Sequence, residues 1–149
     1  MIGGIIVYAK EAKRIRPSKS YEISLPRCVQ EEYDGRVSSF WFAGEPLLLQ
    51  LSSYIREDGP QVTARNRLQE RIAKTPGNWT YWKRPLNENP QVDQATAELL
   101  DEHGVLWVHS YFVWSHLAVY ATISGPPDVI RNPDNWAIKG LHSLEPIVQ

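Results

Sequence analysis

The chain has 149 residues, the usual size of one domain and enough to enclose a hydrophobic core, so we expect a single domain over residues 1–149. Hydrophobic residues make up 42% of the chain and charged residues 22%, a balance that excludes the disordered and membrane-embedded classes. The 16 Lys and Arg residues nearly balance the 17 Asp and Glu residues, and the net charge of −1 argues against a dedicated nucleic-acid binder.

Cysteine use and the N-terminal sequence favour a cytoplasmic protein. Cys28 is the one cysteine, so no internal disulfide can form. The apolar run at 5–9 is shorter than the core of a signal peptide, and its basic residues follow it instead of preceding it. No apolar stretch reaches the ~20 residues that cross a bilayer. We therefore expect a cytoplasmic protein that does not associate with membranes.

The first part of the chain predicts short strands. Two weakly patterned strands are expected at 5–9 and 21–25, with a basic loop or short helix over 10–19 between them. The aromatic-rich segment 37–43 has the composition of a third strand.

The next two segments predict a pair of helices. In 46–57 the apolar residues recur at helical spacing, Pro46 suits the first position of a helix, and Gly59 follows its end. The segment 60–74 carries a thinner apolar stripe, with basic residues on its other face. Because the connection between the two segments is short, we expect them to pack as a helical hairpin.

A strand and a third helix are expected next. The segment 79–83 is short and aromatic, as is typical of a strand. For 90–103 the end signals favour a helix: Asn89 can cap it, Pro90 can begin it, and Gly104 can end it.

The last third of the chain predicts a β-hairpin followed by a helix. Segments 105–114 and 117–124 alternate and are rich in β-branched and aromatic residues, with a tight turn at 115–116. A fourth helix is expected at 135–144. Because helices and strands do not alternate regularly, we expect an α+β fold, with an antiparallel sheet of about five or six strands and three or four helices packed mainly on one face.

The histidines do not predict a metal site. With the turn at 115–116, His109 lies opposite Thr122, roughly 20 Å along the strand from His116. Those two imidazoles therefore cannot share one ion. His103 fits the end of the expected helix at 90–103, where the helix dipole favours a positive charge. No phosphate-binding loop and no G-x-S-x-G motif is present, so we expect no cofactor and assign no catalytic residue.

Aromatic residues are the most informative feature of the chain, with six Trp and seven Tyr. Strand alternation puts Trp107, His109 and Tyr111 on one face of 105–114, and puts Phe112 and Trp114 on the other. Because both faces carry large apolar side chains, this strand is either covered on both sides or presents a binding surface. A homodimer formed through this strand is also compatible with the pattern.

These features favour a non-catalytic protein that binds a protein partner, of the bacterial immunity or inhibitor type that blocks the active cleft of a toxin or enzyme. Residues 86–103 carry five acidic and no basic side chains, which could complement a cleft that handles anionic substrates. The residues expected to contact the partner are Asp93, Glu98, Asp101, Glu102, Trp107 and Tyr111.

Two other functions stay open. The first is a small-ligand-binding protein or enzyme with an apolar aromatic pocket between sheet and helices, for which the expected lining is His109, Tyr111, Trp41 and Trp114. The second is a nucleic-acid-binding module built on the basic face of 60–74, although the net charge of the chain argues against it.

Overall fold

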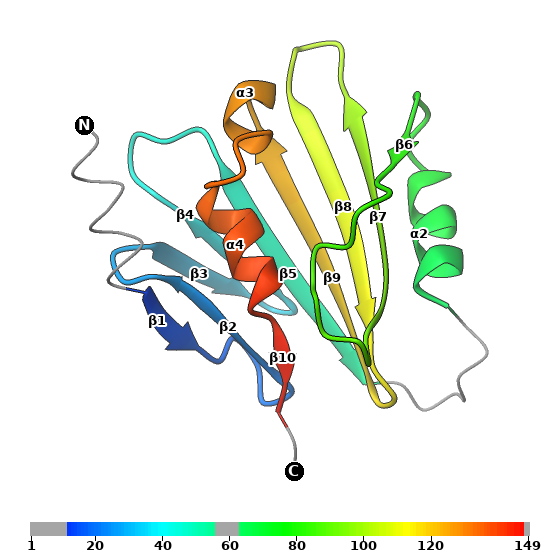
Figure 1. Cartoon of the computed structure of the whole chain (residues 1–149). Helices are drawn as coiled ribbons and strands as arrows, with labels where there is room; N and C mark the ends of the chain where they lie inside the picture. The colour runs from blue at the N-terminus through cyan, green and yellow to red at the C-terminus, as the bar shows by residue number, and fades with distance from the viewer. Residues whose placement is uncertain (1–11, 56–62, 148–149) are drawn as a thin grey trace.

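The computed structural model describes residues 12–55 and 63–147 (Figure 1). Of these residues, 44% lie in strands and 16% in three short helices. The strands form two antiparallel sheets, one with the order β3-β4-β5-β9-β8-β7-β6 and the other with the order β1-β2-β10. The protein is therefore mostly β, and the expected α+β fold with three or four packed helices is wrong. The elements are β1 Ala12–Ile15, β2 Tyr21–Pro26, β3 Gln30–Asp34, β4 Val37–Trp41, β5 Leu48–Ile55, α2 Ala64–Ile72, β6 Thr80–Tyr81, β7 Asp93–Leu100, β8 Leu106–Val113, β9 Leu117–Gly125, α3 Pro127–Ile130, α4 Trp136–His142 and β10 Glu145–Pro146.

The expected helix at 46–57 is wrong, because this segment contains strand β5. β5 lies inside the large sheet, hydrogen-bonded to β4 on one side and to β9 on the other. Leu49 and Leu51 are fully buried on one face, while Leu48 is partly exposed on the other. A strand inside a sheet carries apolar residues on both faces, and such a run also matches the spacing of a helix.

The expected helix at 90–103 is also wrong, because its middle forms strand β7. All eight residues of β7 pair with β8, from Asp93 opposite Val113 to Leu100 opposite Leu106. Ala, Glu and Leu favour a helix locally, but the pairing with a long hydrophobic strand prevails. Gly104, with φ of +80°, lies in the turn of this hairpin instead of ending a helix.

The structure confirms several other predicted elements. The segments 60–74 and 135–144 contain α2 and α4, and the side chains of Thr63 and Asn135 cap the two helices. The hairpin of β8 and β9 turns at 115–116, where the Trp114 amide donates to the Leu117 carbonyl over 2.8 Å. Strands β4 and β6 lie within the segments predicted at 37–43 and 79–83. Strand β2 covers the segment predicted at 21–25 and ends one residue later, at Pro26.

The N-terminal predictions fare differently. The basic segment 10–19 contains strand β1 in place of the expected loop or short helix. Strand β3, whose five residues are all exposed, has no counterpart in the sequence prediction. The strand expected at 5–9 lies outside the described residues.

The hydrophobic core covers one face of the large sheet, which we call the core face. It packs against the small sheet and α4, which stand in front of the large sheet in Figure 1. Buried core residues come from both sides of this interface, including Ile23 of β2, Phe40 of β4, Phe112 of β8 and Leu141 of α4. No helix among the described residues is long and apolar enough to cross a membrane.

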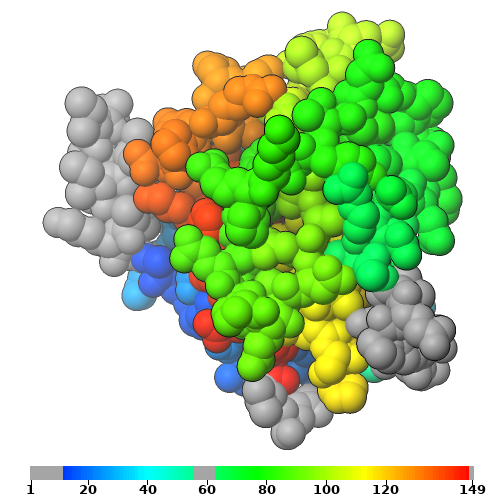
Figure 2. Space-filling view, turned by 45° about the vertical axis from the view of Figure 1, so that its right-hand side comes forward, coloured from blue at the N-terminus to red at the C-terminus, as the bar shows by residue number. Residues whose placement is uncertain are grey.

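The second face of the large sheet is covered only in part. Helix α2 packs against β7 and β8 through Ala64, Leu68 and Ile72. The chain from α2 to β7, coloured green in Figure 2, passes around the edge of the sheet, and its residue Leu86 is buried on the core face. Farther along this face, on β4, β5 and β9, several side chains remain partly exposed. We call this part of the second face, together with the adjoining residues of β8, the open face.

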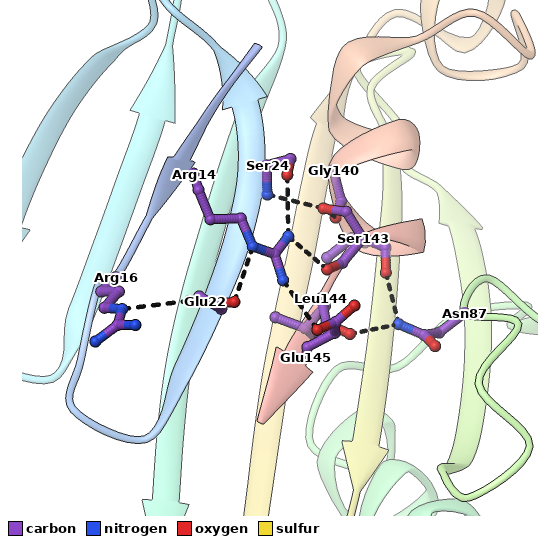
Figure 3. A network of polar contacts seen from close by, with 10 residues as sticks. Arg14, Arg16, Glu22, Ser24, Asn87, Gly140, Ser143, Leu144 and Glu145 are labelled. Atoms are coloured by element: carbon purple, nitrogen blue, oxygen red, sulfur yellow. Dashed lines mark hydrogen bonds and ion pairs between the residues drawn. The ribbon is translucent and has the colours of Figure 1, made fainter. Parts of the chain in front are cut away.

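A polar network joins the small sheet to the end of α4 (Figure 3). The guanidinium of Arg14 donates to the Ser24 hydroxyl over 2.9 Å and to the Ser143 carbonyl over 2.8 Å, and its Nε lies 3.1 Å from the Glu22 carboxylate. The Ser24 amide donates to the Ser143 hydroxyl over 2.8 Å. These contacts tie β1 and β2 to the residue that follows α4.

Asn87 ties the same end of α4 to the loop before β7. Its buried side-chain amide donates to the carbonyls of Leu141 and Leu144 over 3.0 and 2.9 Å (Figure 3). Leu141 lies in the last turn of α4 and Leu144 lies two residues beyond the helix, so Asn87 supplies a donor to carbonyls on both sides of the helix end. The Gln94 side chain in turn accepts from the amides of Leu86 and Asn87.

Candidate binding face

Two tryptophans lie in one row across the open face. Trp41, Leu48, Ser124 and Trp107 are successive partners on β4, β5, β9 and β8, so their side chains share this face. All four are partly exposed. Three strand spacings separate the two tryptophan backbones, a distance of about 14 Å. The row therefore offers large apolar surface at both ends.

A second row, next to the first, is polar. Ser39, Gln50, Thr122 and His109 are successive partners on the same four strands, and all are partly exposed. The Gln50 amide donates to the Ser39 hydroxyl over 3.2 Å. The hydroxyls, the amide and the imidazole give this row both donors and acceptors. The apolar row and the polar row together make a mixed surface on the sheet.

His109 stands where the open face meets the part covered by α2. Its Nδ1 lies 2.5 Å from the Tyr120 hydroxyl, and its ring makes edge contacts with Trp79 and Trp107 at centroid distances of 4.8 and 6.4 Å. Burial, and secondly the positive charge of Arg71, lower the pKa of His109 from 6.5 to about 4. His109 is therefore neutral at neutral pH and shares a hydrogen bond with the Tyr120 hydroxyl.

The pKa values of this pair do not suit acid–base catalysis. Burial raises the pKa of Tyr120 to about 12, so its hydroxyl holds its proton tightly. A histidine with a pKa of about 4 is a weak base, and general acid–base catalysis works best with a pKa near the operating pH. The pair therefore holds the imidazole in one orientation and does not provide an activated proton donor or acceptor.

Arginines of α2 pack over the tyrosines of the second face. The Arg71 guanidinium lies 4.4 Å from the centre of the Tyr120 ring, and that of Arg65 lies 3.4 Å from the centre of the Tyr81 ring. Tyr111 and Tyr120, whose rings are 4.6 Å apart, are only 7% exposed. Cation–π contacts of this kind help to hold the helix against the sheet, and Tyr111 and Tyr120 are buried in one cluster with the apolar residues of the helix.

The acidic residues predicted to contact a partner do not form one patch. Because Asp93 and Glu98 are five residues apart on one strand, their side chains leave opposite faces of the sheet. Asp93 accepts from the Ala64 amide over 2.8 Å at the start of α2. Glu98 accepts from the Trp82 indole over 2.9 Å and pairs with Arg131 at 2.7 Å.

The other two acidic residues lie in the turn between β7 and β8. Asp101 accepts from the amides of His103 and Val105 and from the Trp107 indole, all within 3.0 Å. These hydrogen bonds, that of Trp107 first, lower the pKa of Asp101. Glu102 is exposed and lies 3.5 Å from His103. Three of the four predicted carboxylates, those of Asp93, Glu98 and Asp101, thus accept hydrogen bonds that hold the fold together. In the described part of the chain, Glu102 has only the exposed contact with His103.

The four residues predicted to line one ligand pocket are separated. His109 and Tyr111 lie on the second face, and Tyr111 is buried beneath α2. Trp41 lies on β4, which is separated from the strand of His109, β8, by β5 and β9. Trp114 belongs to the core on the opposite side of the sheet, where it stacks with Phe112. The predicted alternation along β8 is correct, and it places Trp114 and His109 on opposite faces of the sheet, so the structure does not bring these two residues together.

Sequence reasoning missed the middle of the open face. Leu48 and Gln50 are on β5, which was expected to be a helix, and Ser39 is on β4, next to it. The alternation of buried Leu47, Leu49 and Leu51 was the available signal. Among residues 12–55 and 63–147, no group of three His, Cys, Asp or Glu could hold a metal ion.

Comparison with known proteins identifies a fold and no family. No protein-family model and no curated protein matches the sequence. One similar solved structure is a protein of Bacteroides thetaiotaomicron VPI-5482, with 14% sequence identity and a TM-score of 0.61. The match covers 93% of this chain and 50% of that one, so this chain spans about half the length of its structural neighbour. At this identity the likeness extends to the fold alone.

Proposed function

We propose that this protein is a non-catalytic binding protein that holds a protein partner on the open face of its large sheet. The observation that carries the proposal is the row from Trp41 to Trp107, in which two partly exposed tryptophans flank Leu48 on a rigid sheet. Tryptophan dominates the energetic centres of protein interfaces, and polar groups beside it supply directional hydrogen bonds. The neutral His109–Tyr120 pair supports binding over proton transfer.

The inhibitor version of this function draws less support from the geometry. It calls for acidic side chains that are free to face a basic cleft, whereas Asp93, Glu98 and Asp101 accept hydrogen bonds within the protein. The aromatic part of the expected interface is better supported, through Trp107 but without the buried Tyr111. Cys28 is exposed and has no disulfide partner, which suits a reducing compartment such as the cytoplasm.

The test is capture of the partner with matched variants. A photo-crosslinking amino acid at Leu48 should trap one dominant protein, and the same group at Tyr33, which is 50% exposed on the edge strand β3, should not. The double substitution Trp41→Ser/Trp107→Ser should weaken binding of that protein by at least about thirtyfold, the loss expected of interface centres. The control Tyr33→Ser should leave the affinity unchanged.

Two results would contradict the proposal. One is a partner that binds the double variant and the wild type equally, because its binding site then lies elsewhere. The other is the absence of any protein crosslinked through Leu48. If the captured protein is a second copy of the chain, light scattering will show a dimer that the double variant loses, which would identify the open face as a homodimer interface.

A further inference from the structure

A cavity of about 570 Å³ lies on the other side of the molecule, away from the open face. Its walls come from the end of β2, the turn between β4 and β5, and the segment that joins α3 to α4, which meet at the upper left of Figure 1. Cavities of 300–1,000 Å³ are typical of small-molecule sites in proteins. The volume therefore suits a small organic ligand and is too small for a macromolecule.

The walls of this cavity are largely apolar. Leu25, Phe42 and Leu47 are buried there, and Trp136 packs edge-on against Phe42 with 5.1 Å between the ring centres. Val129 of α3 closes another side. Such a lining favours a ligand with an apolar or aromatic body, since that body leaves water for an apolar surface.

The charges at the rim favour a cation. Glu45, Asp134 and Lys139 line the cavity, so its rim has two carboxylates and one ammonium. Lys139 lies 3.4 Å from Asp134 and so offsets that carboxylate, which leaves Glu45 as the unbalanced charge. Aromatic rings also attract cations through their faces. A ligand carrying an ammonium group would match the rim, and one carrying a carboxylate would be repelled.

We propose that this cavity binds an amphipathic organic cation, a small molecule with an apolar or aromatic body and an ammonium group. The apolar walls hold the body, and the ammonium faces Glu45 at the rim. The site shares no lining residue with the open face, so it is independent of the proposed protein binding.

Three probes with the same ring and different end groups test the proposal: 2-phenylethylamine, 2-phenylethanol and 3-phenylpropionate. Each is titrated at millimolar concentration into the full chain with ¹⁵N-labelled tryptophan, and the indole signal of Trp136 is assigned with Trp136→Phe. We expect saturable binding of the amine, with an affinity at least about tenfold above that of the carboxylate and with the alcohol between them. The Trp136 signal should shift on binding.

Matched variants separate charge recognition from unspecific association. Glu45→Gln should weaken binding of the amine and leave the alcohol unchanged. Lys139→Gln should strengthen binding of the amine, because it leaves the Asp134 carboxylate without its ammonium partner. Lys83→Gln makes the same change in net charge at a residue that does not line the cavity, so it should leave binding of the amine unchanged. Val129→Trp should fill the cavity and abolish binding of all three probes.

The proposal is overturned if the carboxylate binds as tightly as the amine, if no probe saturates, or if binding survives in Val129→Trp. Thermal denaturation of each variant without probe establishes that it is folded. If Val129→Trp does not fold, the opposite effects expected of Glu45→Gln and Lys139→Gln, both at exposed positions, still decide the question.

Discussion

Acidification should destabilise this protein through His109. The imidazole is held neutral against Tyr120 and near Arg71, with a pKa of about 4 in the folded state against 6.5 for an unperturbed histidine. Between these two values the unfolded chain binds a proton that the folded chain does not. The free energy of unfolding therefore falls as the pH drops through 6.5, and this loss is complete near pH 4.

The size of this loss follows from the separation of the two pKa values. Proton linkage gives a loss of about 2 kcal/mol between pH 7 and pH 5, and about 3 kcal/mol once pH 4 is reached. Such a loss is a substantial part of the ~5–15 kcal/mol that stabilises a typical domain. His116, which is exposed in the turn between β8 and β9, serves as the matched control.

The assay is urea denaturation at a series of pH values for the wild type, His109→Gln and His116→Gln. Between pH 7 and pH 5 the wild type and His116→Gln should lose about 2 kcal/mol more than His109→Gln, which has no imidazole to protonate at this position. Equal pH dependence in all three proteins would refute the reasoning. So would an NMR titration of the folded wild type in which His109 takes up its proton near pH 6.5.

Three substitutions test contacts that position the elements. Asn87→Ala removes two buried hydrogen bonds at the end of α4 and should lower the free energy of unfolding, measured by urea denaturation, by about 2–4 kcal/mol. A loss below ~1 kcal/mol would show that water takes the place of the side-chain amide. Gly140→Ala would place a methyl group 2.6 Å from Leu25 Cδ2 and should destabilise the protein by about 1–3 kcal/mol, even though alanine has the higher helix propensity. An increase in stability would mean that the Leu25 side chain moves aside without cost. Asp93→Ala removes the acceptor of the Ala64 amide and should cost about 1 kcal/mol, with faster hydrogen exchange in α2 than in α4; equal exchange in the two helices would contradict a capping role.

Local sequence determined the elements whose signals have a single interpretation. The hairpin of β8 and β9 follows from its β-branched and aromatic residues and from a turn with room for two residues. The helix α4 follows from its apolar spacing, and the Asn135 side chain that caps it accepts from the Ala137 and Ile138 amides. The alternation along β8 likewise determined which side chains share a face, including His109 with Trp107.

Tertiary structure decided the identity of β5 and β7. Both segments carry patterns that fit a helix as well as a strand, because leucines on both faces of β5 match either period and the residues of β7 have high helix propensity. Each pairs along its full length with one neighbouring strand, β5 with β9 and β7 with β8, and this pairing selects the strand. This choice turned an expected helical layer into two strands of the large sheet.

The candidate sites depend on the same choice. Trp107 is far in the sequence from Trp41 and Leu48, and only the strand order β4-β5-β9-β8 brings all three into one row. The expected acidic face over 90–103 disappears for the same reason, since a strand sends Asp93 and Glu98 to opposite sides of the sheet. The sequence determined which side chains are available for binding, whereas long-range strand pairing, which no local pattern encodes, decided which of them meet.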